Sequence, residues 1–82
     1  MKLREITVIT YDGYKAAEHP LRFILNGHTY QVTEIIDRWY EGSAAPGEVY
    51  LIYFKVKADD GRIYLLRYNG LFDAWAILEP EE

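Results

Sequence analysis

Apolar and polar residues alternate along much of this chain, and the clearest case surrounds the pair Asn26-Gly27. Asn-Gly is typical of a tight β-hairpin, because a type I′ turn requires a positive φ angle at both central residues. The facing pairs in this register are Leu25–His28, Phe23–Tyr30 and Leu21–Val32. We predict that these pairs share the core face, with Ile24 as an apolar exception on the opposite face.

The alternation slips immediately after this hairpin. Continuing the core face from Val32 would bury Glu34, and burying an unpaired charge is costly. A β-bulge near residues 33–35 would shift the alternation by one residue and bend the strand. The pattern therefore predicts a long, kinked strand that ends with residues 37–40. Residues 41–48 are rich in Gly, Ala and Pro and predict a loop.

A second hairpin is predicted around Asp59-Asp60-Gly61. Residues 49–58 are dense in β-branched and aromatic side chains, and a three-residue loop with Gly61 in the left-handed region suits this turn. The facing pairs are then Ala58–Arg62, Val56–Tyr64, Phe54–Leu66 and Ile52–Tyr68. These pairs form an apolar face. The outer face carries Tyr53, Lys55, Lys57, Ile63, Leu65 and Arg67.

Residues 3–11 and 74–79 complete the set as first and last strands, and Asn69-Gly70 starts a turn. The small side chains of Ala74 and Ala76 leave room for close packing, and residues 15–18 could form one helical turn. About six strands with frequent turn signals predict an all-β fold without substantial helix, either a strongly bent antiparallel sheet or an SH3-like barrel. We expect one domain over residues 1–82, with an acidic tail at 80–82.

Aromatic residues explain how so short a chain could be stable. It has 82 residues and no Cys, so disulfide bonds cannot stabilise it. Eight Tyr, three Phe and two Trp are present instead, and each ring buries a large apolar area. The rings expected on core faces are Phe23, Tyr30, Phe54, Tyr64 and Tyr68, joined by Trp39 and Trp75.

Net charge and hydropathy narrow the classes of function. The formal charge is −4, but Glu79, Glu81 and Glu82 supply three of the acids; without them the balance is 9 − 10 = −1. A basic footprint over the whole chain is therefore absent. No apolar stretch approaches the roughly 18 residues of a membrane span, and Glu5 interrupts any secretory leader, so we expect a cytoplasmic protein without membrane contact.

Several of these motifs together resemble a known family. They are the runs Gly27-His28-Thr29-Tyr30-Gln31-Val32, Ile35-Ile36-Asp37-Arg38-Trp39, Tyr53-Phe54-Lys55-Val56-Lys57, Asp60-Gly61 and Tyr64-Leu65-Leu66, with Trp75. The chain resembles, over roughly residues 20–79, an uncharacterised family of small bacterial all-β domains. Members occur alone or C-terminal to proteins resembling Y-family DNA polymerases. The resemblance implies no catalytic residue, and it favours a role near DNA repair or replication.

The sequence contains little that suggests catalysis. Ser43 is the only Ser and has no His nearby in sequence, while His19 and His28 lack a third ligand at metal-binding spacing. Asp59 and Asp60 fit a turn, and the dispersed glycines form no phosphate loop. We therefore expect no catalytic residue, no metal site, no cofactor and no enzymatic activity.

One pair of acids lies near the predicted bulge, where re-aimed side chains can form a site. These are Glu34 and Asp37. An ion pair with Arg38, or a solvated position, accounts for them more simply.

The outer face of the second hairpin is the best candidate site. Tyr53 lies among Lys55, Lys57 and Arg67, and single-stranded nucleic-acid binders interleave basic and aromatic residues in this way. Basic residues on an exposed ribbon also serve simply for solvation and edge protection.

Apolar residues on the same face, Ile63 and Leu65, have two interpretations. They could be covered by the N-terminal strand or by residues 41–48, or they could form a partner surface. The sequence thus predicts a non-catalytic binding module, most simply for another protein or a second copy of the chain, with single-stranded nucleic acid as the alternative. The predicted binding residues are Tyr53, Lys55, Lys57, Ile63, Leu65 and Arg67.

Overall fold

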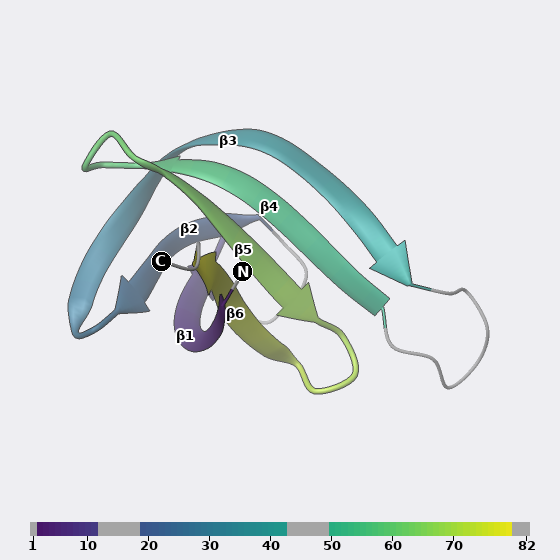
Figure 1. Ribbon diagram of the computed structural model, residues 1–82. Helices are drawn as coiled ribbons and strands as arrows, with labels where there is room; N and C mark the ends of the chain where they lie inside the picture. Colours follow the sequence, from purple (N-terminus) through teal and green to yellow (C-terminus); the bar gives the residue numbers. More distant parts are fainter. Residues whose placement is uncertain (1, 12–18, 43–49, 80–82) are drawn as a thin grey trace.

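The computed structural model describes residues 2–11, 19–42 and 50–79, which form six antiparallel strands. The strands are β1 (Lys2–Thr10), β2 (Pro20–Leu25), β3 (His28–Gly42), β4 (Tyr50–Ala58), β5 (Ile63–Asn69) and β6 (Ala74–Glu79). Each strand pairs with the next, and β6 returns to β1, so the sheet closes into a barrel (Figure 1). The all-β prediction with about six strands is confirmed, and the described part contains no helix.

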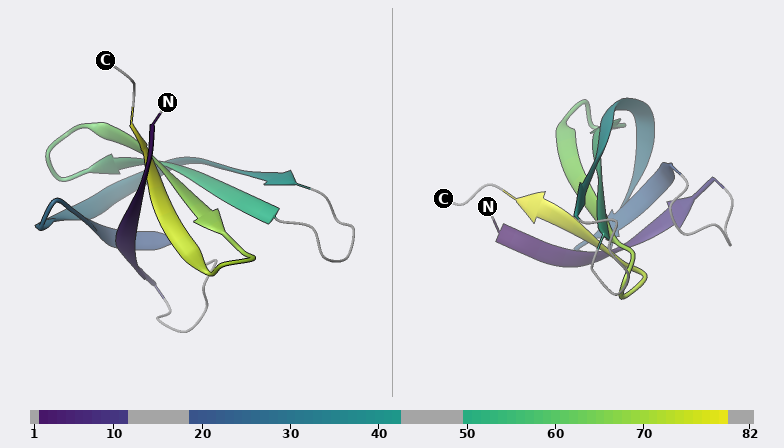
Figure 2. Two further views of the ribbon diagram at one scale, coloured as in Figure 1. Left: turned by 60° about the horizontal axis from the view of Figure 1, so that its bottom comes forward. Right: turned by 90° about the vertical axis from the view of Figure 1, so that its right-hand side faces the viewer.

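Barrel closure, which the sequence pattern leaves open, depends on the pairing of the first and last strands. The register runs from Lys2 opposite Glu79 to Ile6 opposite Trp75. The left-hand view of Figure 2 shows β1 and β6 side by side along this pairing. The following residues of β1, Thr7–Thr10, pair with β2, so β1 connects the last strand of the barrel to the second.

The first hairpin has the predicted register at the pairs Leu25–His28 and Phe23–Tyr30, whereas Val32, predicted to face Leu21, is paired with Ala58 on β4. Asn26 and Gly27 have φ angles of 54° and 78°, as a two-residue turn with positive φ at both positions requires. Phe23 faces Tyr30 and is completely buried, and their rings stack at 5.1 Å between centroids. His28, expected on the core face, is instead exposed at the rim, where its ring packs against the Tyr30 ring at 60° with 4.4 Å between centroids.

Two bulges bend β3 where it changes partner. Its first residues pair with β2, whereas the rest pairs with β4 with register shifts between Val32 and Glu34 and between Ile35 and Asp37. The first shift confirms the predicted bulge, since Glu34 is exposed and Ile35 packs against the core. The second adds to the single bulge that the sequence pattern predicts.

The second bulge corrects the expected position of Trp39. With one bulge, alternation from Ile35 would turn both Asp37 and Trp39 toward the core. The extra residue turns both to the outer face, where Asp37 is exposed and Trp39 is half-buried opposite Tyr53. The expectation that Trp39 joins the core is therefore wrong, because it would have required burying Asp37 as well.

β3 also extends further than the sequence suggests. Glu41 and Gly42 pair with Leu51 and Tyr50, so the predicted start of the loop at residue 41 is wrong. Residues 43–48 of that loop lie outside the described residues, as does the helical turn expected at 15–18.

The second hairpin also has the predicted register. Gly61 has a φ angle of 81°, its amide donates to the carbonyl of Ala58 at 2.9 Å, and the Ala58 amide donates to the Arg62 carbonyl at 3.0 Å. The inner pairs are Val56–Tyr64, Phe54–Leu66 and Ile52–Tyr68, as predicted.

These inner pairs form most of the barrel core. Its buried residues are Phe23, Ile52, Phe54, Val56, Ala58, Leu66, Tyr68, Trp75 and Ile77. Aromatic rings account for four of these nine, and Tyr68 and Phe54 both contact Trp75, at 5.2 and 5.5 Å between centroids. The core positions predicted for Phe54, Tyr68 and Trp75 are confirmed.

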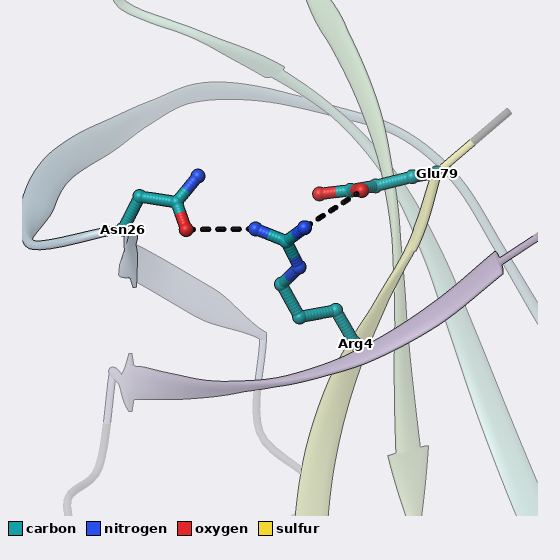
Figure 3. A network of polar contacts seen from close by, with 3 residues as sticks. All are labelled: Arg4, Asn26 and Glu79. Atoms are coloured by element: carbon teal, nitrogen blue, oxygen red, sulfur yellow. Dashed lines mark hydrogen bonds and ion pairs between the residues drawn. The ribbon is translucent and has the colours of Figure 1, made fainter. Parts of the chain in front are cut away.

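An arginine joins three elements at one end of the barrel. Arg4 on β1 donates from Nη1 to Oδ1 of Asn26 in the β2–β3 turn at 2.7 Å, and its Nη2 lies 3.5 Å from Oε2 of Glu79 on β6 (Figure 3). Both carboxylate and guanidinium are partly exposed, so this ion pair contributes little stability, at most about 1 kcal/mol.

Candidate functional site

All six residues of the predicted site lie together on the outer face of β4 and β5. They form the facing pairs Tyr53–Arg67, Lys55–Leu65 and Lys57–Ile63. The three-residue turn at Gly61 produces this register, because its length decides which residues of the two strands face each other.

Barrel closure extends the apolar part of this face onto two more strands. Leu65 on β5 faces Leu78 on β6, and Leu78 faces Leu3 on β1. We call Leu3, Leu65 and Leu78 the leucine row. Ile63 lies beside its end and is 49% exposed.

The N-terminal strand does not cover Ile63 and Leu65. Instead, β1 pairs with β6 and β2 and adds Leu3, itself 46% exposed, to the same surface. Residues 43–48, the other expected cover, lie outside the described residues.

Trp39 on β3 extends the site beyond Tyr53, on the side away from the leucine row. Its ring stacks on Tyr53 at 5.3 Å between centroids and 4° between planes. One row therefore crosses five strands, in the order Trp39, Tyr53, Arg67, Ala76 and Glu5. The sequence pattern with a single bulge does not place Trp39 in this site, because its outward position depends on the second bulge.

The two lysines of the site each face an acid across the β3–β4 pairing. Lys55 faces Asp37 and Lys57 faces Glu34. Of the two positions expected for Glu34 and Asp37, the solvated one is observed: both are exposed, and no ion pair with Arg38 is found among the described residues. The Arg38 guanidinium instead donates to the Tyr40 hydroxyl at 2.7 Å and lies over the Phe54 ring. The β3–β4 register therefore places one negative charge opposite each of the two lysines of β4.

A pocket of about 310 Å³ adjoins the leucine row over β5, β6 and β1. Its lining residues are Leu3, Glu5, Arg67, Asn69, Phe72, Ala74, Trp75 and Ala76. Ala74 and Ala76, which the sequence suggests as close-packing positions, contribute their small side chains to this hollow. The sequence could not reveal the pocket, because its walls come from both ends of the chain.

The Asp59-Asp60 pair has the turn role that the sequence suggests. Asp60 accepts hydrogen bonds from the Arg62 amide at 2.9 Å and from the Tyr64 hydroxyl at 2.6 Å. The Tyr64 hydroxyl bond is the main cause that lowers the pKa of Asp60. Among the residues described, no cluster of three His, Asp or Glu side chains could hold a metal ion.

Two further results bear on function. In the described ranges, no helix has the length and apolar character needed to cross a membrane. Among known proteins, no family model, no curated protein and no solved structure matches this chain.

Proposed function

We propose that this barrel is a non-catalytic module that binds another protein through its outer face. The leucine row is the observation that carries the proposal. It aligns three leucines across β5, β6 and β1, and Ile63 continues the apolar surface. Contiguous exposed apolar surface with a polar rim is typical of protein-interaction sites.

Charge also favours a protein partner. Lys55 and Lys57 each face an acid, so the face lacks the net positive charge that attracts phosphates. Domains with SH3-like barrels bind peptides along aromatic-lined grooves, and the Trp39–Tyr53 stack supplies a comparable aromatic surface here. We expect such a partner in the cytoplasm, the location indicated by the sequence.

Substitution in the leucine row tests the proposal. Leu65→Glu places a charge at its centre, and Ile24→Glu is the matched control, because Ile24 is also half-buried but lies on β2, across the ring of strands from β5. We expect affinity capture to recover a partner with the wild-type chain and Ile24→Glu, and to lose it with Leu65→Glu. Light scattering identifies the case in which this partner is a second copy.

A monomer that captures the same proteins with and without Leu65→Glu would contradict the proposal. Circular dichroism of both variants confirms that each is folded before the comparison is made.

Single-stranded nucleic acid is a second candidate, supported by one feature. The near-parallel, half-buried rings of Trp39 and Tyr53 lie beside Arg67 and Lys55, and aromatic rings next to cations are where nucleic-acid binders stack bases. The resemblance to domains attached to Y-family-like polymerases agrees with this candidate. A fluorescence titration with single-stranded DNA at about 50 mM salt should show binding that weakens with salt and with Trp39→Ala. Absence of binding at that salt would eliminate it.

A further inference from the structure

The pocket beside the leucine row has the size of a site for a single residue. At about 310 Å³ it lies at the lower end of the roughly 300–1,000 Å³ typical of ligand pockets. Its walls come from Leu3, Phe72 and Trp75, while Ala74 and Ala76 contribute only methyl groups. The lining is thus suited to one large apolar side chain.

The turn between β5 and β6 positions the most exposed of these walls. The side chain of Asn69 accepts hydrogen bonds from the amides of Leu71 and Phe72, at 3.0 and 3.3 Å, and Asp73 accepts one from the Tyr68 hydroxyl at 2.6 Å. Phe72 is nevertheless 72% exposed. An aromatic ring held at a pocket rim and open to solvent is available for contact with a ligand.

Arg67 supplies an unused charge to the same pocket. Its Nε atom is buried without a hydrogen-bond partner, and within the described ranges no carboxylate lies at ion-pair distance from its guanidinium. Its cross-strand neighbours are Tyr53 and Ala76, whereas Lys55 and Lys57 face acids. A guanidinium with free donors beside an apolar pocket favours a carboxylate ligand.

Glu5 restricts the ligand further. It faces Ala76 from β1, on the side opposite Arg67, and it also lines the pocket. A ligand with one carboxylate near Arg67 is therefore accommodated, while a second negative charge near Glu5 is repelled.

We propose that this pocket binds the C-terminal residue of a partner protein, with its apolar side chain between Phe72 and Leu3 and its α-carboxylate on Arg67. A chain end carries both groups on one residue, which suits a pocket of this volume better than an internal segment that must leave at both ends. The proposal rests on the proposed protein-binding function and specifies the part of the partner that is recognised.

A titration of the full chain with N-acetyl-L-tryptophan, followed by amide NMR shifts, tests this proposal. The probe has a free carboxylate and an indole ring. We expect saturable shifts at the amides of Arg67, Asn69, Phe72 and Ala76, and binding at least tenfold weaker for N-acetyl-L-tryptophanamide, which lacks the charge. Equal affinity for the two probes, or no shifts at these amides, would overturn the proposal without requiring any variant.

Two arginine variants locate the charge. Arg67→Met keeps the aliphatic stem and should weaken N-acetyl-L-tryptophan binding at least tenfold. Arg22→Met is the control, because Arg22 also has a buried Nε without a hydrogen-bond partner but lies on β2. Equal loss in both variants would contradict the assignment to Arg67.

Peptides separate a chain end from an internal acid. A peptide ending in Trp with a free carboxylate should bind, while its C-terminal amide with an internal Asp beside Trp should not. If the amide binds equally well, recognition of a chain end is excluded. If Leu65→Glu loses partner capture but the wild-type chain does not bind N-acetyl-L-tryptophan, this pocket assignment is eliminated. The protein-binding function then still stands.

Discussion

Single tyrosine hydroxyl groups tie the turns of this barrel to its core. Tyr64 donates to Asp60 and Tyr68 donates to Asp73, both at 2.6 Å. Burial, reinforced by these carboxylates, raises the pKa of both tyrosines well above its usual value near 10. The folded state therefore favours their protonated, neutral form.

These raised pKa values predict a loss of stability at alkaline pH. The contribution of Tyr64 and Tyr68 is complete below pH 10, where the unfolded chain also keeps its protons, and it is lost as pH rises toward the folded-state pKa values. We expect the free energy of unfolding to fall above pH 10 by at most about 1.4 kcal/mol per pH unit for each tyrosine.

Urea denaturation at pH 9 to 11.5 measures this slope. Tyr64→Phe and Tyr68→Phe should each reduce it, since phenylalanine does not ionise. A slope that is the same in both variants and the wild type would assign the alkaline effect to other groups.

The absence of a side chain at Gly70 leaves room for the ring of Tyr50. A Cβ atom there would fall within the Tyr50 ring, which packs toward Tyr68 with 6.5 Å between centroids. Replacing Gly by Ala where space allows stabilises a protein by about 0.4–1 kcal/mol. Here we expect Gly70→Ala to destabilise by at most about 1 kcal/mol, because the Tyr50 ring, which is 44% exposed, must move aside.

A double-mutant cycle with Tyr50→Ala checks this cause. In that background Gly70→Ala should become neutral or stabilising, as measured by urea denaturation. An unchanged cost would show that the Gly70 backbone, and not the Tyr50 ring, sets the penalty.

At the level of elements, the two bulges of β3 decide which face each of its side chains occupies. One bulge follows from the cost of burying Glu34, and the same reasoning applies to Asp37, which a single bulge would have turned inward. The sequence thus held a signal for the second bulge. The position of Trp39 beside Tyr53 does not follow from that signal alone. It also depends on the β3–β4 register, which is set by contacts between the two hairpins.

The two tryptophans should therefore differ in solvent access. Trp75 is 8% exposed in the core, whereas Trp39 is half-buried on the outer face. We expect Trp39→Phe to leave fluorescence that is shifted to the blue and resists quenching by acrylamide, at a cost in stability of less than about 1.5 kcal/mol.

Wild-type emission, which contains both rings, is the reference for this experiment. More efficient quenching after loss of Trp39 would indicate that Trp39, and not Trp75, is the shielded ring.

For the molecule as a whole, closure of β1 on β6 is the step that joins distant parts of the chain. It pairs Lys2 with Glu79, whereas both predicted hairpins pair near neighbours. Closing a long loop costs more entropy than closing a short one. We therefore expect folding in milliseconds to seconds, with β1 docking after the hairpins have formed.

Kinetics of Ile6→Ala test this order. Ile6 on β1 packs against the core, so the variant should unfold faster while its folding rate changes little. Val56 on β4 faces Tyr64 within the second hairpin, so Val56→Ala should slow folding. Stopped-flow fluorescence measures both, and a large decrease in the folding rate of Ile6→Ala would place β1 docking early.

Local patterns were sufficient for the hairpins and for part of the candidate site. Asn26-Gly27 and Gly61 need positive φ angles, and turn length then sets which side chains face each other, so the six site residues could be placed on one face. These are short-range constraints, which a sequence expresses directly.

The leucine row, the Trp39–Tyr53 stack and the pocket around Arg67 could not be read from such patterns. Each joins strands that are distant along the chain, such as Leu3 with Leu78, or depends on the register between hairpins. Alternation shows which face a side chain occupies but carries no information about the neighbouring strand. The alternating pattern therefore indicates an all-β fold with apolar residues on one outer face, and the packing of its first strand against its last joins them into the leucine row with an adjoining pocket.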